Sequence, residues 1–313
     1  MTGNLGPPTA PETPPSAPRT AEIIRRFDAM AGSYDELEPW YEHLYARLHA
    51  ILGFELARTS VATRRRALDA GCGTGFQTAM LAGAGYAAHG VDVAGAALAV
   101  ARARLPAVAL TRASVEALPY RDGCFGAVVC LGSTLSFVED PGRALGEMGR
   151  VLHGGGWLLL ECEHKWSLDL AWMGASALLG GALGYGVSLR ALRRALARPL
   201  GASCVIDYPE YGPLRLFTRG ELARLLGAAG LAVERAWGVH SATGLLPSTL
   251  LHRPRLPAPA RPLYAALRAA DRWLEGTPLA RALASSYVVL ARKGNAASER
   301  QGRRARPWRG ARR

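Results

Sequence analysis

The sequence predicts an α/β protein built on a doubly wound, largely parallel sheet, and three observations lead to this prediction. From residue 67 onward, short apolar runs alternate with helical stretches. A glycine-rich turn at 71–75 joins the first apolar run to a helical stretch. The 313 residues are 49% hydrophobic and 20% charged, which is enough for a sizeable core and excludes wholesale disorder.

The apolar runs predict the strands, and the amphipathic stretches between them predict the helices. Strands are expected at 67–71, 87–93, 108–114, 125–132, 154–163, 231–239 and 286–293. Helices are expected at 76–84, 94–104, 141–152 and 218–229. Thr218 is a suitable N-cap for the last of these helices, and Gly230 ends it.

Outside this alternation the chain divides into a cap, two inserts and two polar ends. Residues 21–60 have two apolar patterns at helical spacing and predict a helical cap. The α/β domain is expected at 61–293, with long inserts at about 165–213 and 240–284. Residues 1–20 are rich in Pro and Thr, without the basic and apolar regions of a signal peptide, and are expected to be a disordered lead. Residues 294–313 are expected to be a disordered, Arg-rich tail.

The charge and the cysteines narrow the function classes. The formal net charge is +13, and residues 298–313 contain seven Arg against one Glu. This tail is interpreted as a solvated end, with an anchor to an anionic surface as the alternative. The five cysteines form no CxxC pair, so neither a metal site nor a disulfide framework is expected, and a reducing, cytoplasmic setting is favoured.

The motif with the most chemical content is ALDAGCGTG at 67–75. Gly71, Gly73 and Gly75 allow a sharp turn and a close approach of the backbone to a ligand. The spacing is GxGxG and not the GxGxxG of dinucleotide-binding folds, and Asp69 precedes the turn. Asp92 ends the second strand, where a carboxylate can accept two hydrogen bonds from a ribose diol.

With these motifs the chain resembles class I S-adenosylmethionine (SAM)-dependent methyltransferases. It is most similar to the small-molecule group that includes ubiquinone/menaquinone-biosynthesis methyltransferases. The resemblance rests on FDAMAGSYD (27–35), LDAGCGTG (68–75), VDV (91–93) and the stretch 114–156, which occur in the order of the family. It implies a seven-stranded Rossmann-like sheet whose last strand is antiparallel, with SAM as the cofactor and no metal.

The resemblance also implies a set of cofactor-binding residues. Asp69 would hold the ammonium of SAM, Asp92 the ribose, and Tyr34 would cover the cofactor. The full expected set is Tyr34, Asp69, Gly71, Cys72, Gly73, Gly75, Asp92, Val93, Ser114, Val115, Glu116, Leu131 and Gly132. Ser114 departs from the family, which often has Asp there, and its hydroxyl is expected to bind the adenine more weakly.

Acceptor-side residues are expected beyond the carboxyl ends of the strands, where ligands lie in open α/β sheets. Candidates after the fourth and fifth strands are Ser133, Thr134, Glu161, Glu163 and His164. His164 is the preferred candidate base because imidazole titrates near neutral pH, and a structural histidine is the alternative. Tyr41 and His43 of the cap are further candidates for the catalytic site.

The first insert indicates the chemistry of the acceptor. Residues 170–187 contain no charge but five glycines, and are interpreted as a lid over an apolar substrate, a segment inserted in one leaflet, or, least favoured, a membrane span. Residues 188–200 predict a basic amphipathic helix, which suits an anionic membrane surface, with an ordinary solvated helix as the alternative. A hydrophobic acceptor is therefore expected: a quinone, isoprenoid, lipid or polyketide-like molecule.

The predicted function is SAM-dependent methyl transfer to oxygen or carbon of such a small acceptor, in the cytoplasm or at the membrane surface. An RNA or protein methyltransferase is the alternative suggested by the charge of +13. Nucleic acid is disfavoured, because CLGST (130–134) stands where an NPPY-like tetrapeptide would support methylation of amide or base nitrogen. A non-catalytic, membrane-peripheral SAM-binding protein is a further alternative.

Overall fold

The computed structural model describes residues 18–33, 38–58, 66–208 and 211–294. The lead and the tail lie outside these residues, apart from 18–20 and Gly294, and Tyr34 also lies outside them. The expectations for these segments therefore stay predictions.

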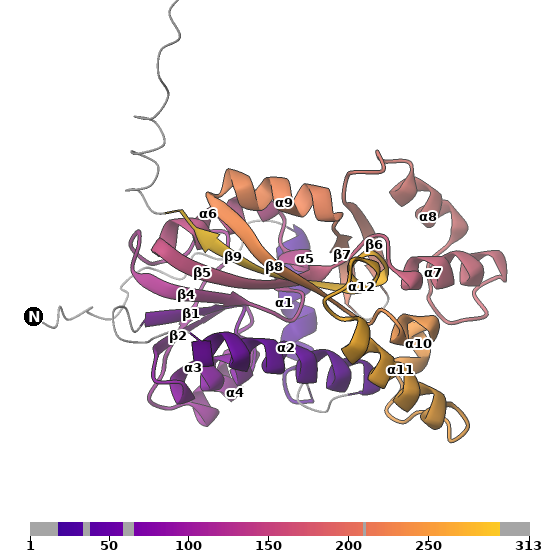
Figure 1. The fold of residues 1–313 in the computed structure, drawn as a ribbon, viewed down its shortest axis with the longest axis horizontal. Coiled ribbons are helices and arrows are strands. Elements are labelled where there is room, and N and C mark those ends of the chain that lie inside the picture. Colours follow the sequence, from indigo (N-terminus) through magenta and orange to yellow (C-terminus); the bar gives the residue numbers. More distant parts are fainter. Residues whose placement is uncertain (1–17, 34–37, 59–65, 209–210, 295–313) are drawn as a thin grey trace, which may run out of the picture.

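A seven-stranded sheet forms the centre of the molecule, in the order β3-β2-β1-β4-β5-β9-β8 (Figure 1). Its central strands are parallel, whereas β9 runs antiparallel to both of its neighbours, β5 and β8. The predicted doubly wound sheet with an antiparallel last strand is thus confirmed. The strands are β1 (Arg66–Ala70), β2 (Ala87–Asp92), β3 (Ala109–Arg112), β4 (Phe125–Cys130), β5 (Leu152–Glu163), β8 (Leu231–Val239) and β9 (Ser286–Lys293).

Helices cover both faces of the sheet because its strands are apolar on both sides (Figure 1). One face packs against α6 (Pro141–Val151) and α9 (Arg219–Ala228) through Leu145, Met148 and Leu226. The side chains of Asp140 and Thr218 cap the N-termini of these two helices, the second as predicted. The opposite face packs against α2 (Pro39–Arg58) and α3 (Phe76–Gly83), and α4 (Gly95–Arg104) lies beside α3.

The helical cap consists of α1 (Pro18–Met30) and α2. Leu44, Leu48 and Leu52 of α2 are buried in the sheet core. Phe27 of α1 packs instead on a small cluster with Ala94 and Ala97 at the start of α4, so α1 lies against α4 and not on the sheet. The two apolar patterns read from the sequence therefore bury against different partners.

The first insert folds as two helices and a β-hairpin with a core of its own. It contains α7 (Leu168–Leu178), α8 (Leu189–Leu196), β6 (Cys204–Tyr208) and β7 (Gly212–Leu216). The hairpin is absent from the sequence prediction. The uncharged stretch does not form one long helix, because α7 ends at Leu178 and Gly180, Gly181, Gly184 and Gly186 follow with positive φ. Among the described residues, no helix has the length and apolar character to span a membrane.

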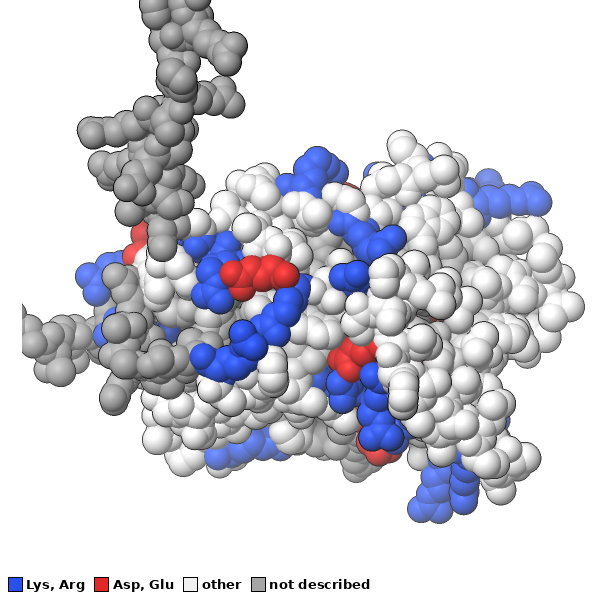
Figure 2. Space-filling model, in the orientation of Figure 1, with Lys and Arg blue, Asp and Glu red and all other residues white. Residues whose placement is uncertain are grey.

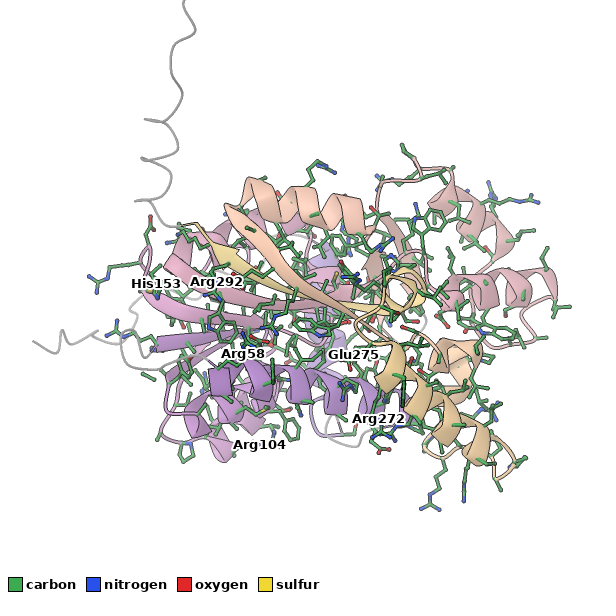
Figure 3. The ribbon with its side chains drawn as sticks, in the orientation of Figure 1. Arg58, Arg104, His153, Arg272, Glu275 and Arg292 are labelled. Atoms are coloured by element: carbon green, nitrogen blue, oxygen red, sulfur yellow. The ribbon has the colours of Figure 1, made fainter. Side chains whose placement is uncertain are left out.

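The second insert carries short helical elements that pack around the end of α2. They are η1 (Thr243–Leu245), α10 (Ser248–Leu251), α11 (Ala260–Leu274) and α12 (Pro278–Leu283). Arg47 of α2 forms an ion pair with Glu275. Glu275 follows α11 and is labelled in Figure 3. Together the two inserts and α2 surround the region beyond the carboxyl end of β5.

Candidate active site

The glycine-rich loop after β1 is held in an unusual backbone conformation. Gly71 has φ +85° and Gly73 has φ +48°, values that glycine adopts without strain. At Gly71 a Cβ would lie 2.2 Å from Oγ1 of Thr134, so a side chain has no room there. At Gly73 a Cβ would meet nothing within 4 Å, so the loop leaves open space on the side of the cavity.

Asp92 at the end of β2 fixes this loop from the side. Its Oδ2 accepts a hydrogen bond from the backbone N–H of Gly73 at 2.8 Å, and its Oδ1 accepts one from Ala94 at the start of α4, also at 2.8 Å. Burial raises the pKa of Asp92, and these backbone donors act in the opposite direction. Each carboxylate oxygen keeps a further lone pair, which suits a ribose diol.

The loop and Asp92 open into a cavity of about 420 Å³. Ten of the residues expected to bind the cofactor line it: Gly71, Cys72, Gly73, Asp92, Val93, Ser114, Val115, Glu116, Leu131 and Gly132. The sequence analysis did not assign the remaining wall, which includes Phe27 of α1, Glu42 and Tyr45 of α2, Gln77 of α3 and Phe137 of α5 (Thr134–Phe137). The apolar spacing of the two cap helices could have indicated it.

Two further expected residues support the loop without lining the cavity. Asp69 is buried beneath it, where its Oδ2 accepts a 2.6 Å hydrogen bond from the hydroxyl of Thr78. Burial raises the pKa of Asp69 to about 7. Gly75 packs against α4, near Ala101 and Leu105. The structure therefore gives both residues structural roles, and a direct contact of Asp69 with SAM stays a prediction.

A second cavity, of about 610 Å³, lies between α2, the end of β5 and both inserts. Aromatic and aliphatic side chains provide most of its wall. Its lining includes Trp40, Tyr41, Glu163, His164, Asp169, Leu183, Tyr185, Tyr208, Tyr211, Leu214, Leu216, Ser248, Leu250 and Ser285. Two of the three predicted catalytic candidates, Tyr41 and His164, thus face the same cavity.

His164 has the geometry of a neutral hydrogen-bonding group. Its Nδ1 donates to the carbonyl of Ala284 at 3.1 Å, and its Nε2 has no hydrogen-bond partner among the described residues. Burial lowers the pKa of His164 to about 4. An imidazole with so low a pKa binds a proton weakly at neutral pH, and the role of His164 as a base stays a prediction.

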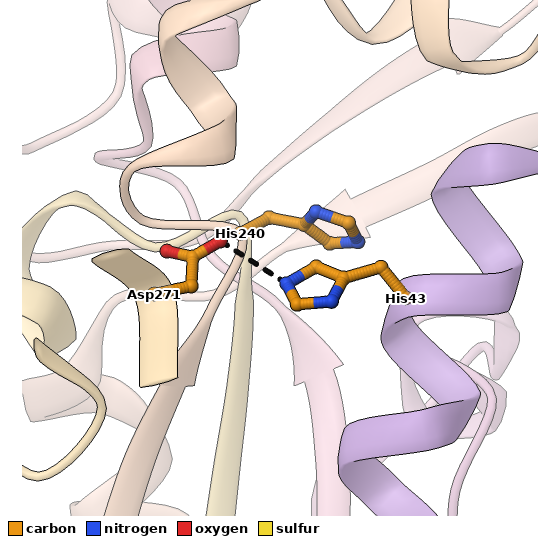
Figure 4. A group of neighbouring side chains, drawn as sticks. All are labelled: His43, His240 and Asp271. Carbon is orange, nitrogen blue, oxygen red and sulfur yellow. Dashed lines mark hydrogen bonds and ion pairs between the residues drawn. The ribbon is translucent and has the colours of Figure 1, made fainter. Parts of the chain in front are cut away.

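His43 lines neither cavity and belongs to a buried cluster with His240 and Asp271 (Figure 4). Its Nε2 lies 3.1 Å from Oδ2 of Asp271. Asp271 also accepts hydrogen bonds from the backbone N–H groups of Ser241 and Ala242 and from the hydroxyl of Thr243. These hydrogen bonds join α2, α11 and the end of β8. Because His43 lines neither cavity, its expected catalytic role stays a prediction.

Two carboxyl groups of β5 meet one hydroxyl at the end of β4. Ser133 donates from its backbone N–H to Oε2 of Glu161 at 2.5 Å, and its hydroxyl lies 2.9 Å from Oε1 of Glu163 and 3.3 Å from Oε1 of Glu161. Ser133 adopts a left-handed conformation, φ +59°, which is uncommon for a residue with a side chain. Burial raises the pKa of Glu161 to about 7 and that of Glu163 well above its ordinary value.

Comparisons with known proteins agree with this geometry. Residues 68–160 match a family of methyltransferase domains. Over these residues the chain is similar to methyltransferase domains, as the class I SAM-dependent resemblance implies. SAM is its cofactor, and the glycine loop, Asp92 and the open space at Gly73 fit it.

Two curated O-methyltransferases are similar to part of this chain. The malonyl-[acyl-carrier protein] O-methyltransferase of Erwinia billingiae is 32% identical over 48% of this chain and 58% of its own length. The ubiquinone biosynthesis O-methyltransferase of Paracidovorax citrulli is 28% identical over 50% of this chain and 68% of its own. The chain thus spans about three fifths to two thirds of the length of these relatives.

A solved structure supports the fold of the methyltransferase domain. It is the 1,6-didemethyltoxoflavin-N1-methyltransferase of Burkholderia thailandensis with bound 1,6-didemethyltoxoflavin and S-adenosylhomocysteine. The match has a TM-score of 0.50 and 18% identity, and covers 90% of this chain and 93% of that one.

Proposed function

We propose that the methyltransferase transfers the methyl group of SAM to oxygen or carbon of a small, largely apolar acceptor bound in the second cavity. The observation that carries this proposal is a contact that connects the residues lining the two cavities. Gly132 lines the cofactor cavity, and the next residue, Ser133, contacts Glu163 of the second cavity. In-line transfer requires cofactor and acceptor to meet, and this contact at the end of β4 connects the linings of the two cavities.

The lining of the second cavity supports an uncharged, oxygenated acceptor. Tyr185, Tyr208 and Tyr211 supply aromatic surface, and Leu214 and Leu216 supply aliphatic surface. Burial disfavours the charged forms of the polar groups there: it raises the pKa of Asp169 and of Glu163 and lowers that of His164. Such a wall suits a phenol, quinol or polyketide-like molecule, whereas a buried net charge would be unfavourable.

The names of the relatives support oxygen as the acceptor atom, since both are O-methyltransferases. The purified protein should transfer tritium from methyl-labelled SAM to the organic-solvent extract of a bacterial lysate. Leu214→Trp should fill the second cavity and abolish transfer, while S-adenosylhomocysteine still binds. Leu263→Trp on the exposed face of α11 is the matched control, and it should leave both properties unchanged.

The partition of the label decides between acceptor classes. Label in the organic phase that disappears with Leu214→Trp supports the small apolar acceptor. Label confined to RNA or protein in the aqueous phase would refute it and support the macromolecular alternative.

We further propose that the first insert faces an anionic membrane, so that a lipid-soluble acceptor reaches the cavity directly. Leu178, Leu179 and Leu200 are 73%, 63% and 75% exposed, and Arg190, Arg193 and Arg194 are exposed nearby on α8. Figure 2 shows basic side chains over α8 beside an uncharged surface over α7. The segment after α7 also lines the second cavity, through Ala182, Leu183 and Gly184.

The residues proposed to contact the lipid differ from those that the sequence indicated in the helix at 188–200. The leucine face of α8 is not available, because Leu192 is buried in the core of the insert and Leu196 packs against it. The exposed leucines at the end of α7 would insert instead, and the arginines would bind the headgroups.

Vesicle sedimentation tests this interface. The protein should sediment with phosphatidylglycerol vesicles and much less with phosphatidylcholine vesicles. Leu178→Ser with Leu179→Ser should abolish sedimentation, whereas Val233→Ser, an equally apolar and partly exposed position on β8, should not. Equal sedimentation of both variants would refute the membrane-facing insert.

A further inference from the structure

We propose that Glu163 is the catalytic base and that Ser133 and Glu161 form a proton relay behind it, which specifies a hydroxyl-bearing acceptor. This inference rests on the proposed function and deepens it. A base is needed only where the nucleophile must lose a proton, so its presence distinguishes a hydroxyl acceptor from a nucleophile that carries no proton.

The alternation of side chains along β5 places the two carboxyl groups on one side of the strand. Glu161 and Glu163 are two residues apart, so both point toward the end of β4, while His164 points to Ala284 before β9. Ser133 lies between the two carboxyl groups, with its hydroxyl in contact with both. Only Glu163 of the pair also lines the second cavity.

The surroundings of the pair keep one proton on it. Glu161 is fully buried, and the titratable groups that face the two carboxyls are Cys130 of β4, Cys162 of β5, Asp169 of α7 and Tyr208 of β6. None of these four groups becomes a cation. Two carboxylates so close together cannot both ionise readily without a cation, so they share a proton at neutral pH.

Proton transfer through the relay and methyl transfer take place in two steps. In the first, the proton of Glu163 passes to Oγ of Ser133 while the hydroxyl proton of Ser133 passes to Glu161, leaving Glu163 ionised. In the second, the acceptor oxygen bonds to the methyl carbon as the carbon–sulfur bond breaks, and the hydroxyl proton of the acceptor passes to Glu163. Both carboxyls are then protonated, and loss of one proton to solvent restores the pair.

The first test measures the pH profile of methyl transfer to hexylcatechol, a phenol with an apolar tail. For the wild type, kcat/KM should rise with pH as the pair loses its second proton. Glu163→Gln should lower kcat by about 100-fold or more, the usual contribution of a general base. Ser133→Ala and Glu161→Gln should leave KM nearly unchanged, lower kcat and displace the pH profile.

The control is Glu234→Gln on β8, which removes a carboxyl that lines neither cavity and pairs with Arg292. This variant should keep the pH profile of the wild type. A profile unchanged in Glu161→Gln and Ser133→Ala, or activity retained in Glu163→Gln, would overturn the relay.

The second test does not depend on activity, so a failure of the proposed function remains distinguishable. Infrared spectra of protein labelled with ¹³C in the glutamate carboxyl groups should show a protonated carboxyl band at pH 7. Both Glu163→Gln and Glu161→Gln should shift or weaken this band, because either change removes one of the two carboxyls that share the proton. A band unchanged in both variants, or its absence from the wild type, would refute the shared proton even if no acceptor were methylated.

Discussion

Replacement of Gly71 by alanine should destabilise the protein far more than the same change at Gly73, although both glycines belong to one loop. Both have positive φ, which costs an alanine about 1–2 kcal/mol. At Gly71 the added Cβ would also lie 2.2, 2.5 and 2.8 Å from three atoms of Thr134. Because Cβ of Thr134 is one of these atoms, rotation of its side chain cannot relieve the clash.

The magnitude follows from these two contributions. Overpacking of this kind costs about 1–3 kcal/mol. The free energy of unfolding should therefore fall by about 2–5 kcal/mol in Gly71→Ala and by about 1–2 kcal/mol in Gly73→Ala, where nothing lies within 4 Å of the new Cβ. For a chain of this size each kcal/mol lowers Tm by roughly 2 °C.

Guanidinium unfolding of the ligand-free protein measures the difference directly, and thermal melts provide a second reading. Thr134→Ser in the Gly71→Ala background should recover part of the loss, since it removes the clashing methyl group of Thr134. Equal losses in the two single variants would refute the reasoning, because the clash with Thr134 would then contribute nothing.

Three further predictions concern buried carboxylates. Asp92→Ala should lower the affinity for S-adenosylhomocysteine at least tenfold by calorimetry, because it frees the loop N–H of Gly73, and an unchanged affinity would contradict the role of Asp92. The folded-state pKa of Asp69, about 7, lies above its unfolded value, so this group stabilises the fold at low pH and loses that contribution as pH rises from about 4 to 7. Asp69→Asn should therefore flatten the decline of unfolding free energy over that range, and an unaltered slope would show that Asp69 titrates normally. Asp271→Ala should cost about 3–5 kcal/mol in chemical unfolding because it leaves buried N–H groups unpaired, whereas Asp271→Asn should cost less; equal losses would contradict this hydrogen-bond account.

Local patterns of the sequence predicted most of the sheet. The strands at 231–239 and 286–293 have the expected bounds, and the other expected strands differ from the observed ones by a few residues at their ends. The hairpin of β6 and β7 was not predicted. Its strands are only five residues long and the second contains Pro213, so its apolar residues become informative only when they pack against α7 and α8.

The type of a residue does not predict the direction of its side chain, as the candidate bases show. The pKa of free imidazole favoured His164, but the pleat of β5 directs it toward Ala284, where burial keeps it neutral. The spacing of Glu161 and Glu163, two residues apart, was the available signal for a shared face. The sequence contained no sign that Ser133 would reach both of them.

The sequence by itself determined the fold class and the glycine loop, because glycine turns and strand periodicity are local properties of the chain. Ten of the cofactor-binding residues that the family resemblance implies line the first cavity. Only the tertiary structure brings together the residues of the second cavity and of the histidine cluster. The second cavity is formed by α2, β5 and two inserts, and the cluster of His43, His240 and Asp271 unites three distant segments. Contacts between segments so far apart depend on how the elements pack, and a single sequence does not record that packing.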